Sequence, residues 1–444
     1  MPSINASEVV NTARLNGFHY LLVAWCSFIM MFDGYDLVIY GSVLPHLMNQ
    51  WNLSPGEAGL LGSSSMVGMM FGAVALGTQA DRFGRRRIIL FCVALFSVAA
   101  LANALATGPS SFALCRFLTG AGLGGVVPNL VTLLKEMSPG HCRNRLINLM
   151  LSFFAVGGLL SGVAGIYLIP AFGWQAPFYL AGLSLLALPL LYKTLPESVA
   201  YLLHRDRQAQ VASLLRRVNR AHQPTGEVSY RLDTTGDVAT RSISALFGQG
   251  RALSTLMLWL AFGLCMLMVY GLNTWLPKLM SNGGYPLGSS IVFLVVMNLG
   301  SLVGTLVSGV IADRWGCKKT LMLFFALAAV SISLLGLRPD ATLLYGLLLL
   351  AGGSTVGCLS VVHTLAADLY PVQVRSTGVS MAAAVGRCGA VAGPLLGGLL
   401  LSLSLPFEQN FMVFAVPGVL AVFAVMLVAR RGLSKTSPIP QRSL

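Results

Sequence analysis

Four charged side chains interrupt segments of this sequence that are otherwise apolar: Asp33, Asp36, Arg116 and Arg387. A charge inside such a segment costs roughly 2.5–3.5 kcal/mol on insertion scales, so it normally faces a cavity or a partner of opposite charge. Asp33 and Asp36 are three residues apart and therefore share one face of a helix. We expect Asp33 to lie near the middle of its segment, with Asp36 slightly further out at a depth that Arg116 reaches.

These residue types suit the binding of a carboxylate and of a proton. A guanidinium stays charged and holds a carboxylate through two hydrogen bonds. An aspartic acid in a low-dielectric cavity is able to gain and lose a proton at physiological pH. The residues therefore predict a proton-coupled site for an organic acid. For Asp36 and Arg116 a second interpretation stays open, namely an ion pair that locks two helices together.

The apolar part of such an acid needs aromatic or small side chains nearby. Tyr35 lies between the two aspartates, and Asn273 and Asn298 are polar residues in later apolar segments. We place Tyr35 and Asn273 in the predicted site. Tyr270 and Trp275 are further candidates, for which ordinary packing or an interfacial belt is the preferred interpretation.

Membrane helices must position these residues. The chain has 444 residues, of which 55% are hydrophobic and 10% are charged, whereas soluble domains carry about 25% charged residues. A spanning helix needs about 20 mostly apolar residues. The sequence predicts an all-α membrane protein with twelve such helices, at 19–45, 57–79, 88–107, 111–134, 146–169, 174–192, 253–276, 287–311, 319–337, 341–365, 376–401 and 408–430.

The basic residues predict the orientation of the chain. Of the 29 Lys and Arg residues, 25 lie in the N-terminus, in the loops after predicted helices 2, 4, 6, 8 and 10, and in the C-terminus. Such loops stay in the cytoplasm, so we expect an inner-membrane protein with both termini in the cytoplasm. The loops also explain the net charge of +14 without nucleic-acid binding. Polar residues 1–18 lead into an apolar stretch too long for a cleavable signal peptide.

An internal repeat divides the chain into two halves. The pattern GxxxDRxG begins at Gly77 and again at Gly309, and LPxLM begins at Leu44 and again at Leu276, both at an offset of 232 residues. Two parallel six-helix halves are the architecture of a transporter that rocks around a site near the midplane. We expect two pseudo-symmetric six-helix bundles, 1–192 and 253–444, joined by a cytoplasmic loop at 193–252.

The joining loop carries nine Lys and Arg residues. Its segment 205–220 is predicted to be an amphipathic helix on the inner membrane surface, and 222–241 to be flexible. We expect the loop to be a linker rather than a binding domain.

The motifs resemble those of a known family. The sequence GTQADRFGRRR around Asp81 resembles the loop between helices 2 and 3 of the major facilitator superfamily, and ADRWGCKK around Asp313 resembles its second-half copy. RFLTGAGLGG, which begins at Arg116, is similar to the helix-4 motif of the superfamily. Asp33-Gly-Tyr-Asp36, its flanks FDGYDLVIYGSVLP and the later GLNTWLPKLM resemble the aromatic acid:proton symporters, bacterial carriers of benzoate, hydroxybenzoates and related acids.

The resemblance implies proton-coupled uptake of an aromatic carboxylate, with benzoate or a hydroxybenzoate as the expected substrate. The expected partners are that acid, protons and the lipid bilayer. We expect no cofactor beyond the proton gradient, no metal, because the eight cysteines have no metal-binding spacing, and no enzymatic activity, because no catalytic motif occurs. Alternating access needs one chain, so we expect a monomer.

The resemblance also implies that the inner loops form a gate, in which acids and arginines of neighbouring helices pair when the inner side is closed. The alternative is that the arginines only set the topology. Cys317 stands where the first half has Arg85, so the second-half latch is expected to be weaker. The predicted gating residues are Asp81, Arg82, Gly84, Arg85, Glu136 and Arg143 in the first half and Asp313, Arg314, Asp368 and Arg375 in the second.

Other functions stay open as alternatives. Pro196-Glu197-Ser198 resembles a motif of sugar porters, but a sugar or polyol site would present many neutral polar side chains rather than charged ones. The alternative is a carrier of the same superfamily for a sugar, a polyol or another organic anion. Drug–proton antiporters tend to have a GP-containing helix 5, and proline is absent from 146–169. A membrane enzyme or sensor has no supporting motif, and chemoreception of aromatic acids is conceivable as a secondary role.

Overall fold

A computed structural model describes residues 3–222, 228–231, 243–248, 250–371 and 374–429. Within these residues, twelve helical segments are long and apolar enough to cross a membrane, as the sequence predicts. The first six are α2 (Gly17–Gln50), α3 (Pro55–Ala75), α5 (Arg85–Ala104), α6 (Pro109–Met137), α7 (Arg143–Phe172) and a sixth span made of α8 (Ala176–Gly182), a 3-10 turn (Leu183–Ala187) and α9 (Leu188–Thr194). The second six are α12 (Ala252–Asn282), α13 (Leu287–Trp315), α14 (Cys317–Leu335), α15 (Ala341–Leu369), α16 (Arg375–Ser402) and α17 (Phe407–Leu427).

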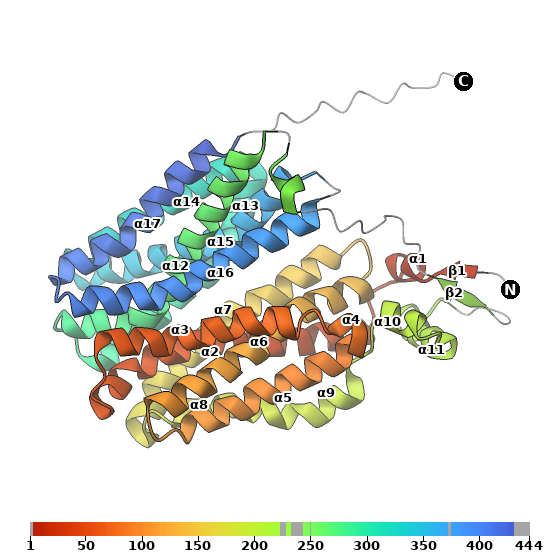
Figure 1. Cartoon of the computed structure of the whole chain (residues 1–444), viewed down its shortest axis with the longest axis horizontal. Helices are drawn as coiled ribbons and strands as arrows, with labels where there is room; N and C mark the ends of the chain where they lie inside the picture. Colours follow the sequence, from red (N-terminus) through yellow and green to blue (C-terminus); the bar gives the residue numbers. More distant parts are fainter. Residues whose placement is uncertain (1–2, 223–227, 232–242, 249, 372–373, 430–444) are drawn as a thin grey trace.

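The two bundles repeat one packing pattern, with each bundle occupying its own side of the molecule in Figure 1. In the first bundle α2 packs against α7, and α6 packs against α3 and α5. In the second, α12 packs against α16, and α15 packs against α13 and α14. Between the bundles α2 contacts α12, α3 contacts α16 and α7 contacts α13. The last two contacts exchange under the internal repeat, so the molecule has the pseudo-symmetry that the sequence predicts.

Local sequence signals fix the ends of the helices. Ser54 begins α3 with a capping box: its hydroxyl accepts the Glu57 N–H at 3.3 Å, and the Glu57 carboxylate accepts the Ser54 N–H at 2.9 Å. Gly84 and Gly316 end α4 (Ala80–Phe83) and α13 with φ angles of 95° and 85°. Only glycine adopts this conformation without strain. The turn after the GxxxDRxG motif is therefore the same in both halves.

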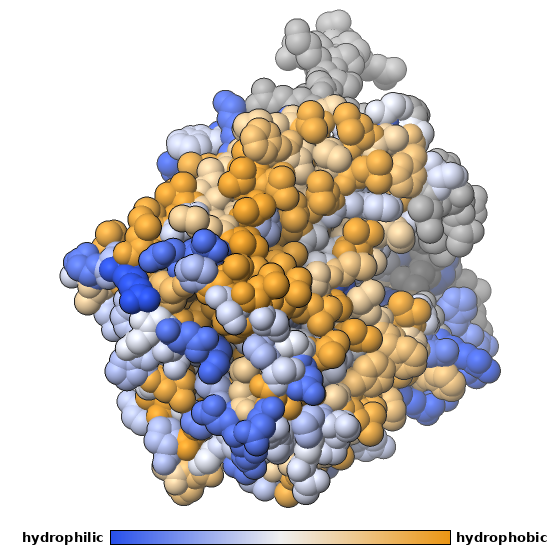
Figure 2. All heavy atoms as spheres, turned by 60° about the vertical axis from the view of Figure 1, so that its left-hand side comes forward, coloured by the Kyte–Doolittle hydropathy of each residue, from blue (hydrophilic) through white to orange (hydrophobic). Residues whose placement is uncertain are grey.

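The lateral surface is apolar. Figure 2 shows hydrophobic side chains spread over much of the molecule, with hydrophilic residues gathered in separate patches. Large side chains that would be buried in a soluble protein face outward, among them Val74, Tyr167, Phe172 and Leu186. A continuous apolar surface of this kind requires lipid around it. The chain is a multi-pass membrane protein.

The bundles approach each other most closely toward one end. We call the end at which α2 begins and α17 ends the inner end, and the opposite end the outer end. Gly59 of α3 lies against Pro394 of α16, and a methyl group on Gly41 of α2 would overlap the carbonyl oxygen of Asn273 of α12. All four residues lie in the outer halves of their helices. The outer end is therefore closed in this conformation.

The segments that precede and follow the first bundle in the sequence fold into a small unit at its inner end. We call this unit the inner module (residues 3–16, 199–222 and 228–231). It contains β1 (Ser3–Asn5), α1 (Ala6–Asn11), α10 (Val199–His204), α11 (Gln208–Val218) and β2 (Ser229–Arg231). β1 and β2 form a parallel pair with Ile4 opposite Tyr230. Asn16 donates to the carbonyls of Arg217 and Val218 at 3.2 and 3.0 Å. The N-terminus and the interdomain segment thus fold together (Figure 1).

The inner module corrects one prediction. The amphipathic helix predicted at 205–220 is present as α11, but its apolar side chains Val211, Leu214, Leu215 and Val218 are buried against protein. The partners are α1, α10, β2 and the start of α2. The helix therefore does not lay this face on the membrane surface. The predicted flexible segment 222–241 lies largely outside the described residues.

Candidate functional site

Asp36 and Arg116 form a buried ion pair inside the first bundle. Nη1 of Arg116 on α6 lies 2.5 Å from Oδ1 of Asp36 on α2. The Ser65 hydroxyl on α3 donates to Oδ2 of Asp36 at 3.2 Å. Asp36 is 5% exposed and Arg116 is 1% exposed, and the guanidinium also faces the ring of Tyr40 at 5.5 Å. The pair and the Ser65 hydroxyl connect α2, α3 and α6.

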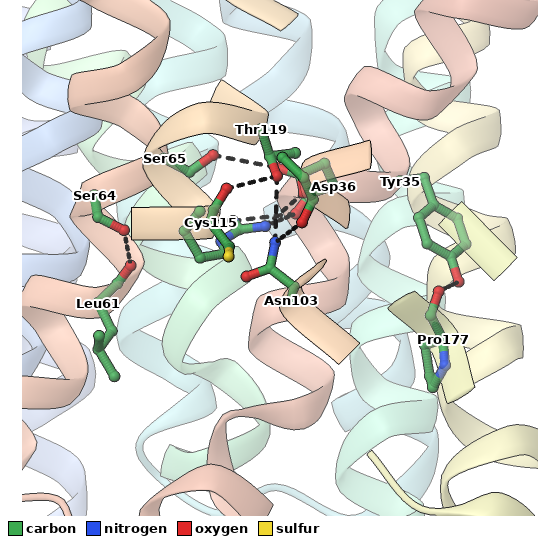
Figure 3. Close-up of polar contacts among 11 residues, drawn as sticks. Tyr35, Asp36, Leu61, Ser64, Ser65, Asn103, Cys115, Thr119 and Pro177 are labelled. Atoms are coloured by element: carbon green, nitrogen blue, oxygen red, sulfur yellow. Dashed lines mark hydrogen bonds and ion pairs between the residues drawn. The ribbon is translucent and has the colours of Figure 1, made fainter. Parts of the chain in front are cut away.

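Further polar side chains surround this pair on its α5 and α6 side (Figure 3). Asn103 of α5 donates to the Thr119 hydroxyl at 3.2 Å, and Thr119 donates to the Cys115 carbonyl at 2.8 Å. Both Asn103 and Thr119 are fully buried. Sequence reasoning missed these residues and Ser65. The Ser63-Ser64-Ser65 run in an otherwise apolar span was the one available signal.

Asp33 lies one turn toward the inner end from Asp36 and has a different environment. It is 7% exposed, and within the described part of the chain its Oδ1 has no hydrogen-bond partner. Asp36 and Arg387 are the charged groups that interact electrostatically with Asp33. Tyr270 interacts electrostatically with Asp33, Asp36 and Arg387. Asp33 is therefore within electrostatic range of charged groups from both bundles.

Arg387 reaches across the two bundles. It is half-buried on α16, and its Nη1 donates to the carbonyl of Met69 on α3 at 3.1 Å. Ser63 of α3 makes a second link to α16 through the carbonyl of Val391 at 2.8 Å. A guanidinium held by one neutral carbonyl keeps further donors for a carboxylate. Arg387 therefore has the geometry of a ligand residue at the junction of the bundles.

The other two predicted site residues have internal partners. The Tyr35 hydroxyl donates to the Pro177 carbonyl of α8 at 2.9 Å, and Figure 3 shows this contact apart from Asp36. Asn273 donates from Nδ2 to the Val269 carbonyl at 2.8 Å and accepts from Asn298 at 3.1 Å. The structure therefore places Tyr35 in the packing of the first bundle and Asn273 at the contact between the bundles.

The two aromatic candidates, Trp275 and Tyr270, have different environments. Trp275 is 0% exposed and donates from its indole nitrogen to the Pro394 carbonyl at 2.8 Å, which is a packing role. Tyr270 interacts electrostatically with Asp33 and Arg387.

The GxxxDRxG loop of the first half makes its contacts within the first bundle. Arg85 forms an ion pair with Glu136, whose second oxygen accepts the Ser198 hydroxyl at 2.7 Å. Glu197 accepts the Arg86 N–H at 3.1 Å and lies against Gly84, where a side chain would overlap its carboxylate. Glu197 and Ser198 of the Pro-Glu-Ser segment thus bond to Arg86 of the loop motif and to Glu136 of α6.

The remaining predicted gating residues are less connected. Arg82 is exposed beside Phe83, and Arg143 donates to Asn11 Oδ1 at 2.5 Å and to the Ser138 carbonyl rather than to Glu136. In the second half Asp313 and Arg314 are exposed. The side chains of Asp81 and Arg375 lie outside the described part of the structure.

In the second half, the residues that match Arg85 and Glu136 also lie side by side. Cys317 occupies the position that matches Arg85, and Asp368 the position that matches Glu136. The Cys317 thiol lies 3.6 Å from Asp368 Oδ2. A neutral thiol contact therefore replaces an ion pair.

Comparison with known proteins places the chain in a family. The model of the Major Facilitator Superfamily matches residues 26–301 and 292–443. The chain is 36% identical to the benzoate transport protein of Acinetobacter baylyi, over 98% of this chain and 95% of that protein. It is 34% identical to the 4-hydroxybenzoate transporter PcaK of Pseudomonas aeruginosa, over 96% and 97%, and 33% identical to the gallate transporter of Pseudomonas putida, over 98% and 97%.

Solved structures support the fold. The inward-open xylose transporter XylE from E. coli aligns with a TM-score of 0.74 at 17% identity and covers 94% of this chain and 98% of that one. These families consist of transporters, so the prediction of a carrier rather than an enzyme is confirmed. The chain belongs to the Major Facilitator Superfamily and, within it, to the family of the benzoate, 4-hydroxybenzoate and gallate carriers.

Proposed function

We propose that this chain takes up an aromatic carboxylate, benzoate or a hydroxybenzoate, together with protons, by alternating access across a bacterial inner membrane. One observation carries the proposal: Asp33 is buried with an unpartnered carboxylate oxygen and shares its surroundings with Arg387 of the other bundle. The relatives named for benzoate, 4-hydroxybenzoate and gallate transport support the substrate class. A sugar, a polyol or another organic anion is the alternative.

The charged residues take different roles in this mechanism. Arg387 holds the substrate carboxylate, because a guanidinium offers two parallel donors to it. Asp33 takes up the proton, since no donor among the described residues bonds to its Oδ1. Asp36 and Arg116 neutralise each other and keep α2, α3 and α6 together as one body. Substrate and proton then bind between the bundles, where a rocking motion exposes them to either side.

Proton coupling has an electrical reason. Moving one elementary charge across 100 mV is worth about 2.3 kcal/mol, and the negative interior of a cell repels a carboxylate. One proton carried with the acid cancels its charge and leaves the pH gradient as the driving force. More than one proton would add the membrane potential.

The orientation also belongs to the proposal. The basic residues concentrate in the loops at the inner end and in both termini, so we place this end in the cytoplasm. The conformation with a closed outer end is then the one that releases substrate into the cell. One chain contains both bundles, and we propose that the monomer is the transporting unit.

The first test is uptake of labelled benzoate and 4-hydroxybenzoate by cells that express the chain, with and without a protonophore, for the wild type and Asp33→Asn. We expect the protonophore to abolish accumulation and Asp33→Asn to reduce it at least tenfold. Asp206→Asn is the matched control, because Asp206 is exposed in the inner module. Accumulation that survives both the protonophore and Asp33→Asn would overturn the coupling mechanism.

A further inference from the structure

Two asparagines form an amide chain in the outer half of the second bundle. Asn273 of α12 is 2% exposed and Asn298 of α13 is 5% exposed. Asn273 donates from Nδ2 to the Val269 carbonyl at 2.8 Å. Asn298 donates from Nδ2 to Asn273 Oδ1 at 3.1 Å and to the Leu294 carbonyl at 2.9 Å. Each link in the chain runs from an amide nitrogen to an oxygen.

This chain fixes which atom Asn298 presents. The main-chain carbonyl of Val269 accepts only, so it orients Asn273 with its oxygen toward Asn298. Asn273 Oδ1 and the Leu294 carbonyl then use both protons of the Asn298 nitrogen. Asn298 Oδ1 is left over, and within the described residues no donor is bonded to it. Asn298 therefore offers an acceptor and no free donor.

The free oxygen faces the first bundle. It lies against Gly158 of α7, where a methyl group would come 2.6 Å from it, with the Val38 side chain of α2 beside the same point. Among the described residues of the first bundle, no polar group bonds to the oxygen at this contact. The contact belongs to the region where the two bundles meet and where the outer end is closed.

Asn298 lies further toward the outer end than Asp33. Val38, which lies beside Asn298 Oδ1 at Gly158, follows Asp33 by five residues on α2, a rise of about 7.5 Å along the helix axis with a turn of about 140° around it. A benzoate that carries a ring substituent opposite its carboxylate has a length similar to this rise. If Arg387 held the carboxylate and the ring extended toward the outer end, the far edge of the ring would lie at the level of Asn298.

We infer that Asn298 Oδ1 accepts a hydrogen bond from a ring hydroxyl of the substrate and that the chain selects hydroxylated benzoates over benzoate. The inference rests on the proposed function and narrows its substrate class. Asn298 offers an acceptor oxygen and no free N–H, so it favours a substrate group that donates a hydrogen bond. A phenolic hydroxyl is such a group. Benzoate gives this oxygen no donor, and a site built to bond a hydroxyl discriminates against the analogue that lacks it.

The competing explanation is that the amide chain only ties α12 to α13. In that case loss of Asn298 would weaken the second bundle and lower the uptake of every substrate by the same factor. Selectivity between two acids separates the explanations, because the ratio of their uptake rates does not depend on how much protein is folded.

The experiment measures initial uptake of benzoate, 3-hydroxybenzoate and 4-hydroxybenzoate by the wild type, Asn298→Leu and Ser301→Ala. Ser301 is a buried residue of the same helix that donates to the Gly352 carbonyl within its own bundle, so Ser301→Ala removes a buried hydrogen bond away from the contact. We expect the wild type to prefer at least one hydroxylated acid, with kcat/KM higher by roughly tenfold to hundredfold. Asn298→Leu should lose most of that preference, mainly through KM, and Ser301→Ala should keep it.

Three results would overturn the inference. The first is that the wild type transports benzoate with the same kcat/KM as both hydroxylated acids. This result can be obtained without any variant protein. Asn298→Leu could lower the uptake of all three acids by one common factor. Failure to transport any of the three acids would reject the proposed function itself, and the inference with it.

Discussion

Asp36 and Arg116 are buried together at the contact of three helices, and each removes the cost of burying the other. A single substitution leaves one uncompensated charge inside the first bundle. For buried pairs this costs about 3–5 kcal/mol, whereas removal of both partners is often close to neutral. The hydrogen bond from Ser65 and the ring of Tyr40 do not replace a lost counter-charge.

We therefore expect Asp36→Asn and Arg116→Gln to be strongly destabilising singly and less so together. Thermal unfolding of the purified protein in detergent measures this. Each single variant should lose about 3–5 kcal/mol, and the double variant should recover a large part of that loss. Single variants as stable as the wild type would contradict a structural ion pair and would favour a direct role of both residues with substrate or protons.

At this scale the sequence predicted which charges are buried better than it predicted their neighbours. The low polarity of the spans marks Asp33, Asp36, Arg116 and Arg387, because a charge there needs a partner. Tyr35 follows a different rule. Successive helix residues turn by about 100°, so a residue beside Asp36 in the sequence faces another helix, and the Tyr35 hydroxyl bonds to Pro177.

At the scale of elements, hydropathy locates the spans but does not say what covers an amphipathic helix. The twelve predicted spans agree with the observed helices to within a few residues at most ends. The break of the sixth span into two helices and a 3-10 turn was not predicted, although Pro189, in the first turn of α9, is a signal for it. The apolar face of α11 predicts only that something buries it. The N-terminal residues that do so are about 200 positions away in the sequence.

A substitution in α1 tests whether the N-terminal residues hold the apolar face of α11 in place. Val10 of α1 is 3% exposed, so Val10→Asp should undock α1 from α11. Burial of a valine side chain contributes about 1.5–3 kcal/mol, so its loss should speed trypsin cleavage after Arg216 and Arg217 by roughly tenfold or more. The control is Glu8→Gln, an exposed change in the same helix. Equal cleavage rates for Val10→Asp and wild type would mean that α11 is held by something other than the N-terminus.

At the scale of the whole molecule, the two bundles contribute different parts of the proposed site. In this proposal the first bundle supplies Asp33, and the second supplies Arg387 and Tyr270. The internal repeat predicts the two bundles, because motifs at a fixed offset must fold alike. It does not predict that the bundles are closed at the outer end. That depends on which of several conformations of a rocking molecule is adopted, and the contacts of Gly41 and Gly59 report it only in three dimensions.

In the proposed mechanism a pH gradient drives an aromatic acid through this chain, with Asp33 as the proton site. The most direct measurement is uptake of labelled 4-hydroxybenzoate and benzoate by vesicles that contain the purified protein, with and without an imposed pH gradient. Protein-free vesicles under the same gradient correct for the neutral acid that crosses lipid unaided, and vesicles with Asp33→Asn test the proton site. We predict accumulation above equilibrium only with the wild type and only with the gradient. Equal accumulation by the wild type and Asp33→Asn, or a rate that the gradient does not change, would contradict the account.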